Sequence, residues 1–279
     1  MKKIAIKILR LLGIERKVIR TLKKINWYFI YLTNNLFNPL IIKQNRDYKT
    51  IPIIIISFNQ LFYLRQLITF LQKHQYKNII IIDNNSTYQP LLDYFDTIES
   101  FVAIHKLKEN LGHLVFWKQK ELYNKYSKGY YVITDPDIVP VANCPGDFVL
   151  HFKRILDKNL QVTKVGFSLK IDDIPDSNPN KQKVIDWESQ FWRNQNKDGN
   201  YHAPIDTTFA LYRPKSDFEN LSNFLRAVRT KEPYTAKHGG WYFDIKNLTA
   251  EQNSYHKLAN ESSSWKIDDN GNLYSNDYD

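Results

Sequence analysis

The sequence predicts an α/β protein in which a mostly parallel sheet is flanked by helices. Short runs of β-branched residues alternate with segments of helical periodicity over the first half of the chain. Within each run apolar and polar residues do not alternate, which is typical of strands buried on both faces of a parallel sheet. The length of 279 residues allows one large domain of this kind with a sizeable core.

The expected elements follow one another in regular order along the chain. In the first half, strands are predicted at 51–57, 77–86, 101–107 and 130–134, with helices between them, the last running from about Leu111 to Gly129. In the second half, strands are predicted at 164–171 and 202–214, and a helix at 217–230. This alternation implies right-handed crossovers between parallel strands.

The net charge of +10 belongs to one end of the chain. Residues 1–24 carry nine Lys or Arg and a single acid, Glu15, whereas the other 255 residues hold 30 basic and 28 acidic side chains. The body is therefore nearly neutral, so we expect no nucleic-acid partner. The one cysteine, Cys144, excludes an internal disulfide and a cysteine-based zinc site.

Residues 1–24 interleave these cations with apolar residues at helical spacing, which predicts a basic amphipathic helix. The aromatic segment that follows is interrupted by Asn34, Asn35, Asn38 and Pro39, and no apolar run reaches the roughly 18 residues of a transmembrane helix. A signal peptide fits poorly, because charges continue through the segment. We expect residues 1–24 to lie on an anionic membrane surface; the alternative is a basic helix packed on its own domain.

Two carboxylates directly follow the strand predicted at 130–134, in the motif Asp135-Pro136-Asp137. Ligands of open α/β sheets bind beyond the carboxyl ends of the strands. Carboxylate oxygens suit Mg²⁺ or Mn²⁺, which take the rest of their ligands from water and substrate phosphates. A simple turn is the alternative for so short a motif. A second copy at 277–279 has no strand before it, and we interpret only the first as a site.

Four segments together resemble a known family. IPIIIISFNQLFYLRQLITFL, NIIIIDNNS, ENLGHLVFW and YYVITDPDIVP are similar to the nucleotide-sugar half of the GT-A (Rossmann-like) glycosyltransferases, most of all glycosyltransferase family 2. The resemblance covers residues 50–145, about a third of the chain. It implies a hexosyltransferase-type enzyme that uses a nucleoside-diphosphate sugar, with a UDP-sugar favoured, together with Mn²⁺ or Mg²⁺.

The resemblance also implies roles for individual residues. Those that would hold the nucleoside are Ser57, Asn59 and Asp83; those near the donor are Asn110, Gly112, His113 and Asp135; and those at the metal are Asp135 and Asp137. A late histidine completes the metal shell in many GT-A enzymes, and the segment around His238 looks similar.

The second half departs from the family's pattern, since it lacks the usual Glu-Asp pair that supplies the base and the Gln-x-x-Arg-Trp motif of processive members. The candidates for a general base are Asp206, which opens DTTFALY, and Glu188, which lies between Trp187 and Trp192. An enzyme that retains the anomeric configuration would need neither. Lys237 and Arg213 are weaker candidates for phosphate contacts.

These inferences divide the chain into a helical arm at 1–45, a catalytic domain at 46–250 and a polar tail at 251–279, with a nucleotide-sugar half at 46–145 and an acceptor half at 146–250. We expect a cytoplasmic protein, peripheral on the inner face of a bacterial membrane, that acts on a surface glycan or a lipid-linked precursor. One alternative is a sugar nucleotidyltransferase, although SFNQLFYLRQ has no glycine for a phosphate-binding loop. The other is a non-enzymatic membrane-binding protein.

Overall fold

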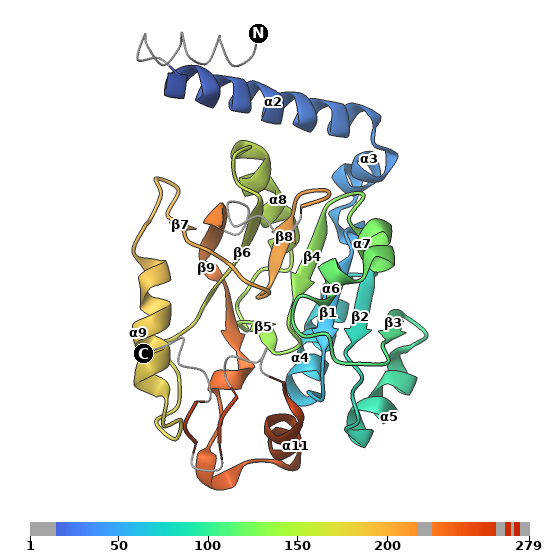
Figure 1. Ribbon diagram of the computed structural model, residues 1–279, viewed down its shortest axis with the longest axis vertical. Helices are drawn as coiled ribbons and strands as arrows, with labels where there is room; N and C mark the ends of the chain where they lie inside the picture. Colours follow the sequence, from blue (N-terminus) through green and yellow to red (C-terminus); the bar gives the residue numbers. More distant parts are fainter. Residues whose placement is uncertain (1–14, 217–224, 261–265, 269–270, 274–279) are drawn as a thin grey trace.

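The computed structural model describes residues 15–216, 225–260, 266–268 and 271–273, and its centre is a nine-stranded sheet (Figure 1). The strands are β1 (Ile53–Ser57), β2 (Ile79–Asp83), β3 (Val102–Lys106), β4 (Tyr131–Thr134), β5 (Ile138–Pro140), β6 (Lys164–Leu169), β7 (Tyr201–His202), β8 (Ala210–Tyr212) and β9 (Ala227–His238). The helices are α2 (Glu15–Phe37), α3 (Pro39–Arg46), α4 (Phe62–Lys73), α5 (Gln89–Ile98), α6 (Val115–Lys118), α7 (Lys120–Tyr126), α8 (Phe148–Lys158), α9 (Lys181–Ser189) and α11 (Ala250–Leu258). Short 3₁₀ helices lie at η1 (Tyr48–Thr50), η2 (Gln190–Trp192), η3 (Gly239–Trp241) and η4 (Ile245–Asn247).

The strand order is β3-β2-β1-β4-β8-β6-β9-β5, and β7 pairs with β9. Strands β3, β2, β1 and β4 are parallel neighbours, whereas β8 runs antiparallel to both β4 and β6. Strand β9 is parallel to β6, and β5 and β7 run antiparallel to β9. Six of the nine described strands thus share one direction, which confirms an α/β fold with a mostly parallel sheet flanked by helices.

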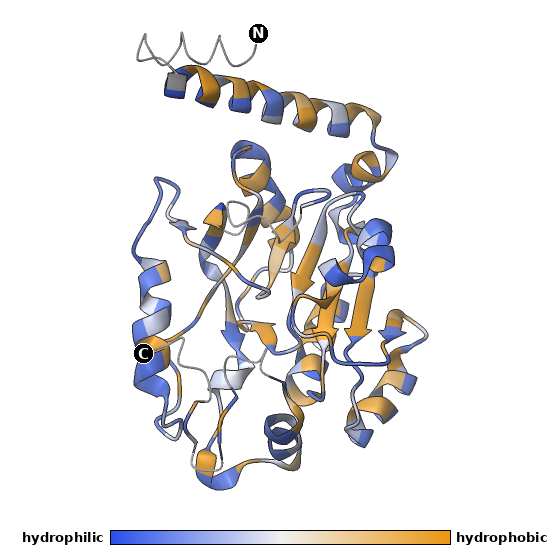
Figure 2. Cartoon of the chain, in the orientation of Figure 1, coloured by the Kyte–Doolittle hydropathy of each residue, from blue (hydrophilic) through white to orange (hydrophobic). Residues whose placement is uncertain are grey.

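The central strands are buried on both faces, as their unbroken apolar runs predict. Ile53 and Ile55 belong to the core cluster that contains residues of α4, α5 and α8, whereas Ile54 and Ile56 point to the opposite cluster with α6. All four side chains are buried, and each such side chain stabilises the fold by about 1.5–3 kcal/mol relative to exposure. Figure 2 shows these strands as the most hydrophobic part of the molecule.

Two predicted elements are interrupted in the structure. The helix expected from Leu111 to Gly129 is two short helices, α6 and α7, which begin only after a turn at Gly112, where φ is +79°. The strand expected at 202–214 is interrupted, because only 201–202 and 210–212 pair with neighbours. The intervening loop carries Asp206 at the cavity described below.

The helix predicted at 217–230 is wrong at its end. Residues 217–224 lie outside the described part of the chain, and 227–230 form the first residues of β9. These residues pair with β6, with Ala227 beside Lys164 and Val228 beside Val165. A buried central position favours β-branched side chains such as Val228 and Thr230, so the sheet overrides the local helical pattern.

From Glu15, where the described residues begin, one helix runs as far as Phe37, and Asn34 and Asn35 do not break it. It ends at Asn38, whose side chain caps α3 by accepting from Leu40 N and Ile41 N, with Pro39 at the first helical position. Of the basic helix expected at 1–24, residues 1–14 lie outside the described part. No helix among the described residues is long and apolar enough to cross a membrane.

The C-terminal region contributes a helix to the body. The boundary predicted between residues 250 and 251 falls inside α11, which starts with a capping box between Thr249 and Gln252. The Glu251 carboxylate accepts from Leu61 N at 2.9 Å and from Phe62 N at 3.0 Å, so α11 is tied to the start of α4. The second Asp-x-Asp, at 277–279, lies outside the described residues.

Candidate active site

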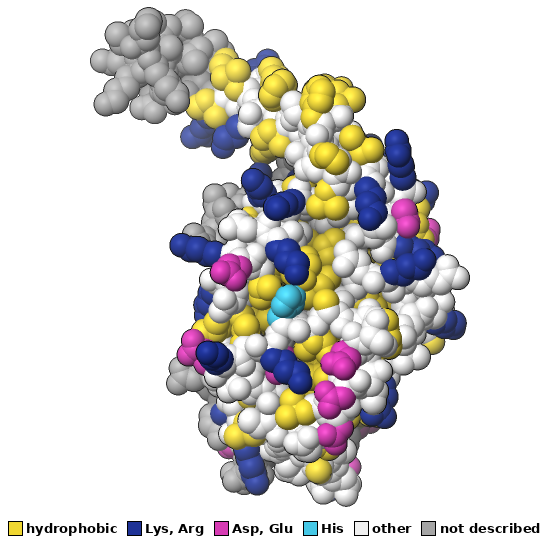
Figure 3. Space-filling view, turned by 90° about the vertical axis from the view of Figure 1, so that its right-hand side faces the viewer, with side chains coloured by type: hydrophobic (Ala, Val, Ile, Leu, Met, Phe, Trp, Pro, Cys, Tyr) yellow, Lys and Arg dark blue, Asp and Glu magenta, His cyan; other side chains and the backbone are white. Residues whose placement is uncertain are grey.

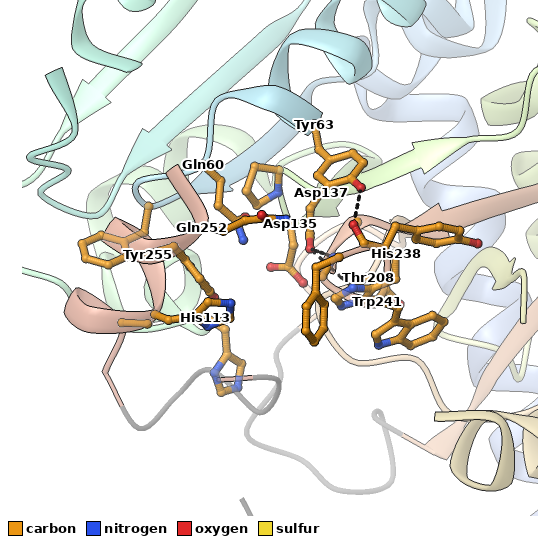
Figure 4. Close-up of a pocket in the computed structure, with 18 of the residues that line it drawn as sticks. Gln60, Tyr63, His113, Asp135, Asp137, Thr208, His238, Trp241, Gln252 and Tyr255 are labelled. Carbon is orange, nitrogen blue, oxygen red and sulfur yellow. Dashed lines mark hydrogen bonds and ion pairs between the residues drawn. The ribbon is translucent and has the colours of Figure 1, made fainter. Parts of the chain in front are cut away.

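A cavity of about 1120 Å³ opens at the carboxyl ends of the parallel strands. Small-molecule sites typically measure about 300–1,000 Å³, so this cavity has room for a ligand with several parts. Its lining comes from both predicted halves of the chain and from α11. In the view of Figure 4, Asp135, Asp137, His238 and Trp241 lie on one side, and His113, Gln252 and Tyr255 lie on the other.

Asp137 is brought to the cavity by strand pairing. Strand β5 pairs antiparallel with β9 and sets Ile138 beside His238, so the preceding residue Asp137 faces the end of β9. The Asp137 carboxylate accepts from Gly240 N at 2.9 Å and lies 3.4 Å from His238 Nδ1, and its carbonyl accepts from Gly239 N at 2.7 Å. The Asp137 side chain, with the residue only 4% exposed, is held in one orientation by the β9 end.

Gly239 allows a close approach on the other side of this turn. A Cβ atom there would meet the ring of Tyr63 at 2.3 Å, so a larger residue would displace that ring. Tyr63 and His238 both line the cavity, and the His238 ring stacks on Trp241 with centroids 4.7 Å apart. Gly239 therefore packs directly against the side chain of Tyr63.

Asp135 and Asp206 both line the cavity, and their charges act on one another. The Thr207 hydroxyl donates to Asp135 Oδ2 at 2.8 Å, and Thr208 N donates to Asp206 Oδ1 at 3.0 Å. Burial raises the pKa of the Asp135 carboxyl well above its usual value, and the charges of Asp137 and Asp206 raise it further. The site therefore concentrates negative charge that a cation would relieve.

Asp206 is also open to the cavity. Its surroundings differ from those of Asp135. The surrounding protein raises the pKa of its carboxyl, but the Thr208 amide and the positive charges of Arg229 and Lys164 outweigh this, so the net pKa is lowered. Asp206 is thus an ionised acceptor at neutral pH, and it is a suitable proton acceptor for a bound hydroxyl.

Glu188 also lines the cavity, but its carboxylate is already paired with Arg229. Its carboxylate forms a buried ion pair with Arg229, whose guanidinium also lies over the ring of Phe191. Burial raises the pKa of Glu188 to about 7, against the opposing effect of Arg229. Transfer of a substrate proton to Glu188 would weaken this ion pair.

The predicted metal ligands all line the cavity. However, no three or more His, Cys, Asp or Glu side chains in the described ranges are arranged to hold a metal ion together. The three-residue shell of Asp135, Asp137 and His238 is therefore not preassembled. The donor chemistry still fits a hard divalent cation, because the carboxylates of Asp135 and Asp137 both line the cavity and supply oxygens. Burial raises the pKa of Asp135 most, and the charges of Asp137 and Asp206 add to this.

The predicted nucleoside residues Ser57, Asn59 and Asp83 lie beneath the lining of the cavity, since each is buried and none of them lines it. Asn59 Oδ1 accepts from Thr87 N at 2.8 Å and from Tyr88 N at 3.0 Å, which shapes the turn after β2. The lining at this end comes instead from neighbours such as Phe58, Asn84 and Tyr88.

Asn110, Gly112 and His113 do line the cavity, as expected. Asn84 fixes their turn to the end of β2, because its amide donates to Gly112 O at 3.1 Å and its oxygen accepts from Leu111 N at 3.3 Å. Asn84 lies in the polar run 83–86 at the end of the second predicted strand. Its position at the cavity could therefore have been predicted from the sequence.

Several lining residues were not predicted from the sequence. They are Gln60, Tyr63, Thr207, Thr208, Trp241, Glu251, Gln252 and Tyr255. The two threonines adjoin Asp206 and could have been found from that neighbourhood. The lining residues of α11 could not be predicted from a local sequence pattern, because they reach the cavity only through the tertiary contact between α11 and α4.

Of the remaining residues named from the sequence, one lines the cavity and the others make contacts elsewhere in the fold. Trp187 lines the cavity, whereas Trp192 packs against Tyr201 with ring centroids 5.2 Å apart. Arg213 donates to backbone carbonyls near the end of α8, including Val162 O at 2.7 Å, and is a structural residue. Lys237 forms an ion pair of 2.6 Å with Asp173.

No family model matches the sequence, and no curated protein matches it. Among solved structures, the mannosyltransferase PcManGT from Pyrobaculum calidifontis, in complex with GDP-Man and Mn²⁺, is similar with a TM-score of 0.46 and 12% identity, covering 81% of this chain and 70% of that one. The 1–349 fragment of TarS from S. aureus gives 0.43 and 12%, covering 68% and 60%. A second TarS structure gives 0.41 and 14%, covering 75% of this chain and 42% of that one.

Proposed function

We propose that this protein is a GT-A-type glycosyltransferase related to family 2, which moves a hexose from a nucleoside-diphosphate sugar to an acceptor hydroxyl. The observation that carries the proposal is the meeting of Asp135, Asp137 and Asp206 in one large cavity at the carboxyl ends of the parallel strands. A UDP-sugar is the favoured donor.

Asp135 and Asp137 would hold Mn²⁺ or Mg²⁺, with waters and the donor diphosphate completing its ligands. The bound ion would neutralise the charge that grows on the departing diphosphate. The contacts of Asp137 with Gly240 N and His238 keep its carboxylate turned to the cavity. His238 then acts as a positioning residue for Asp137.

The acceptor half would supply the base. An acceptor hydroxyl attacks the anomeric carbon, its proton passes to the Asp206 carboxylate, and the bond from that carbon to the diphosphate oxygen breaks. Asp206 is favoured over Glu188 because it is ionised and open to the cavity, whereas Glu188 is paired with Arg229. This assignment makes the enzyme an inverting one.

The acceptor is proposed to be a sugar hydroxyl on a bacterial surface glycan or a lipid-linked precursor. Trp187, Phe191, Trp241 and Tyr242 line the cavity on the side of the acceptor half. Aromatic faces of this kind present the broad apolar surface on which sugar rings stack.

Calorimetric titration tests the donor site. UDP, GDP and CMP are titrated into the protein with and without Mn²⁺, for the unaltered chain and for Asp137→Asn. We expect one nucleoside diphosphate to bind only with the metal, and the substitution to weaken that binding at least tenfold.

Asp96→Asn serves as the matched control, since Asp96 is an exposed carboxylate of α5 that does not line the cavity. It should bind nucleotide like the unaltered chain. If no nucleotide binds in the presence or in the absence of Mn²⁺, the glycosyltransferase proposal fails.

A further inference from the structure

Helix α2 has an inner face that is fixed to the body. The Arg226 guanidinium lies 5.5 Å from the ring centroid of Trp27, and Asn45 donates to the Asn35 side chain at 2.7 Å. Just after the helix, the Asn38 amide donates to Lys128 O at 2.9 Å. These contacts define which side of α2 is turned away from the sheet.

The opposite side of α2 carries an apolar stripe. Its members recur every three or four residues and are each between 36% and 64% exposed: Leu22, Ile25, Phe29, Leu32 and Leu36. Further exposed apolar residues widen the stripe on both flanks, namely Ile19, Tyr28, Ile30 and Phe37. Figure 3 shows hydrophobic side chains gathered along the outer side of this helix.

The charges and hydroxyls of α2 suit a lipid surface. Its first ten residues contain five cations, at 16, 17, 20, 23 and 24, and Glu15 is the one acid between residues 15 and 37. The hydroxyls of Thr21 and Thr33 donate to Lys17 O and Phe29 O within the helix, so neither loses a water partner on burial. An apolar face bordered by Lys and Arg is typical of helices that lie in an anionic interface.

We propose that the outer stripe of α2 docks on the surface of an anionic bilayer and thereby turns the cavity away from that bilayer. A second copy of the chain is the rival occupant, since the stripe also follows a seven-residue repeat. The bilayer is favoured because the apolar face is wider than a two-helix seam, and because the positions beside the seam carry no opposite charges for pairing.

The orientation follows from where α2 meets the sheet. Arg226 directly precedes β9 and Lys128 lies shortly before β4, so α2 crosses the amino ends of these strands (Figure 1). Asp135 and His238 lie at the carboxyl ends of the same two strands. If the proposed glycosyl transfer is correct, the acceptor hydroxyl must be carried on a chain that reaches beyond the body, rather than on a headgroup at the bilayer surface.

Vesicle sedimentation tests the docking. The full chain is mixed with vesicles of phosphatidylglycerol and phosphatidylcholine, or of phosphatidylcholine alone. We expect it to pellet with the anionic vesicles, and to do so less at high salt. The triple variant Ile25→Gln, Phe29→Gln and Leu36→Gln should bind at least tenfold more weakly, while Phe101→Gln, an exposed apolar residue elsewhere, should bind normally.

A second variant, Lys23→Gln with Lys24→Gln, keeps the stripe and should lose preference for anionic vesicles. Absence of the unaltered chain from the anionic pellet overturns the proposal, whether it then sediments as a monomer or as a dimer. Nucleotide binding is measured separately, so failure of docking and failure of the proposed enzyme are distinguished.

Energy transfer to dye-labelled lipid tests the orientation. A dye is attached at Asn26→Cys in α2 or at Lys257→Cys in α11, both exposed positions, whereas the native Cys144 is buried. We expect efficient transfer from the α2 position and weak transfer from α11. Equal transfer from the two positions would overturn the orientation.

Discussion

At the scale of single residues, three of the carboxylates that line the cavity differ in what surrounds them. Asp206 is stabilised as a carboxylate by a backbone amide and nearby cations, whereas burial beside two acids raises the pKa of Asp135. Glu188, paired with Arg229, has a pKa raised by burial to about 7. These differences separate the two candidates for the base by their pH dependence.

If Asp206 is the base, kcat/KM should be level through neutral pH and should fall only in acid, below the lowered pKa of Asp206. If Glu188 were the base, the rate would instead rise through about pH 7, where that carboxyl ionises. Asp206→Asn should lower kcat by about 10²–10⁴ without weakening nucleotide binding. Initial rates from pH 5 to 9, for the unaltered chain and for Asp206→Asn, measure the pH profile and the loss of kcat. A profile that rises near pH 7 would assign the base to Glu188 instead.

Thr207 offers a second test at the residue scale. Its hydroxyl donates to Asp135 Oδ2 and favours the ionised form of that carboxyl. We expect Thr207→Val to weaken Mn²⁺-dependent nucleotide binding by roughly tenfold, the equivalent of one hydrogen bond to a charged group. Thr207→Ser should restore the binding, and if it does not, the hydroxyl is not the cause.

At the scale of elements, α11 acts on α4 across the fold. Leu61, at the start of α4, provides no side-chain cap, and the Glu251 carboxylate accepts from the amides of Leu61 and Phe62 instead. Glu251→Ala should therefore reduce the free energy of unfolding by about 1–2 kcal/mol. Urea unfolding measures this change. Glu109→Ala removes an exposed carboxylate and should cost less than about 0.5 kcal/mol.

The α11 region should also respond to acid through His256. Burial, assisted by Lys266, lowers the pKa of His256 to about 4 from its ordinary 6.5. Between these values the unfolded chain binds more protons than the folded one, so the stability that neutral His256 contributes is lost as pH falls from 6.5 towards 4. His256→Gln should make the unfolding free energy less dependent on pH in this window, as urea titrations at pH 7 and 5 would reveal.

At the scale of the whole molecule, the arm and the body are expected to be separable. The main core cluster begins at Ile41 in α3, and no described residue of α2 belongs to it. Gln44 attaches α3 to the body through two hydrogen bonds with the Tyr130 backbone, of 2.8 and 2.9 Å. A chain that starts at Asn38 should keep its unfolding midpoint, and its nucleotide affinity should change by less than about twofold. It should not bind anionic vesicles. Loss of nucleotide binding in this chain would show that α2 supports the body.

The features of this protein that depend on local pattern could be predicted from the order of its amino acids. Runs of isoleucine between helical segments specify strands buried on both faces, because only such strands avoid an alternation of polar residues. The place of Asp135 and Asp137 followed too, since residues after a parallel strand must emerge at its carboxyl end.

Which distant residues complete the cavity depends on how the folded chain packs. The pairing of β5 with β9 sets His238 beside Asp137, and α11 joins the lining through its contact with α4. Burial likewise assigned Asn59 to the turn beneath the lining, although its sequence position after a strand resembled that of a ligand contact. Strand register and packing are properties of residues far apart in the chain, so no local pattern carries them.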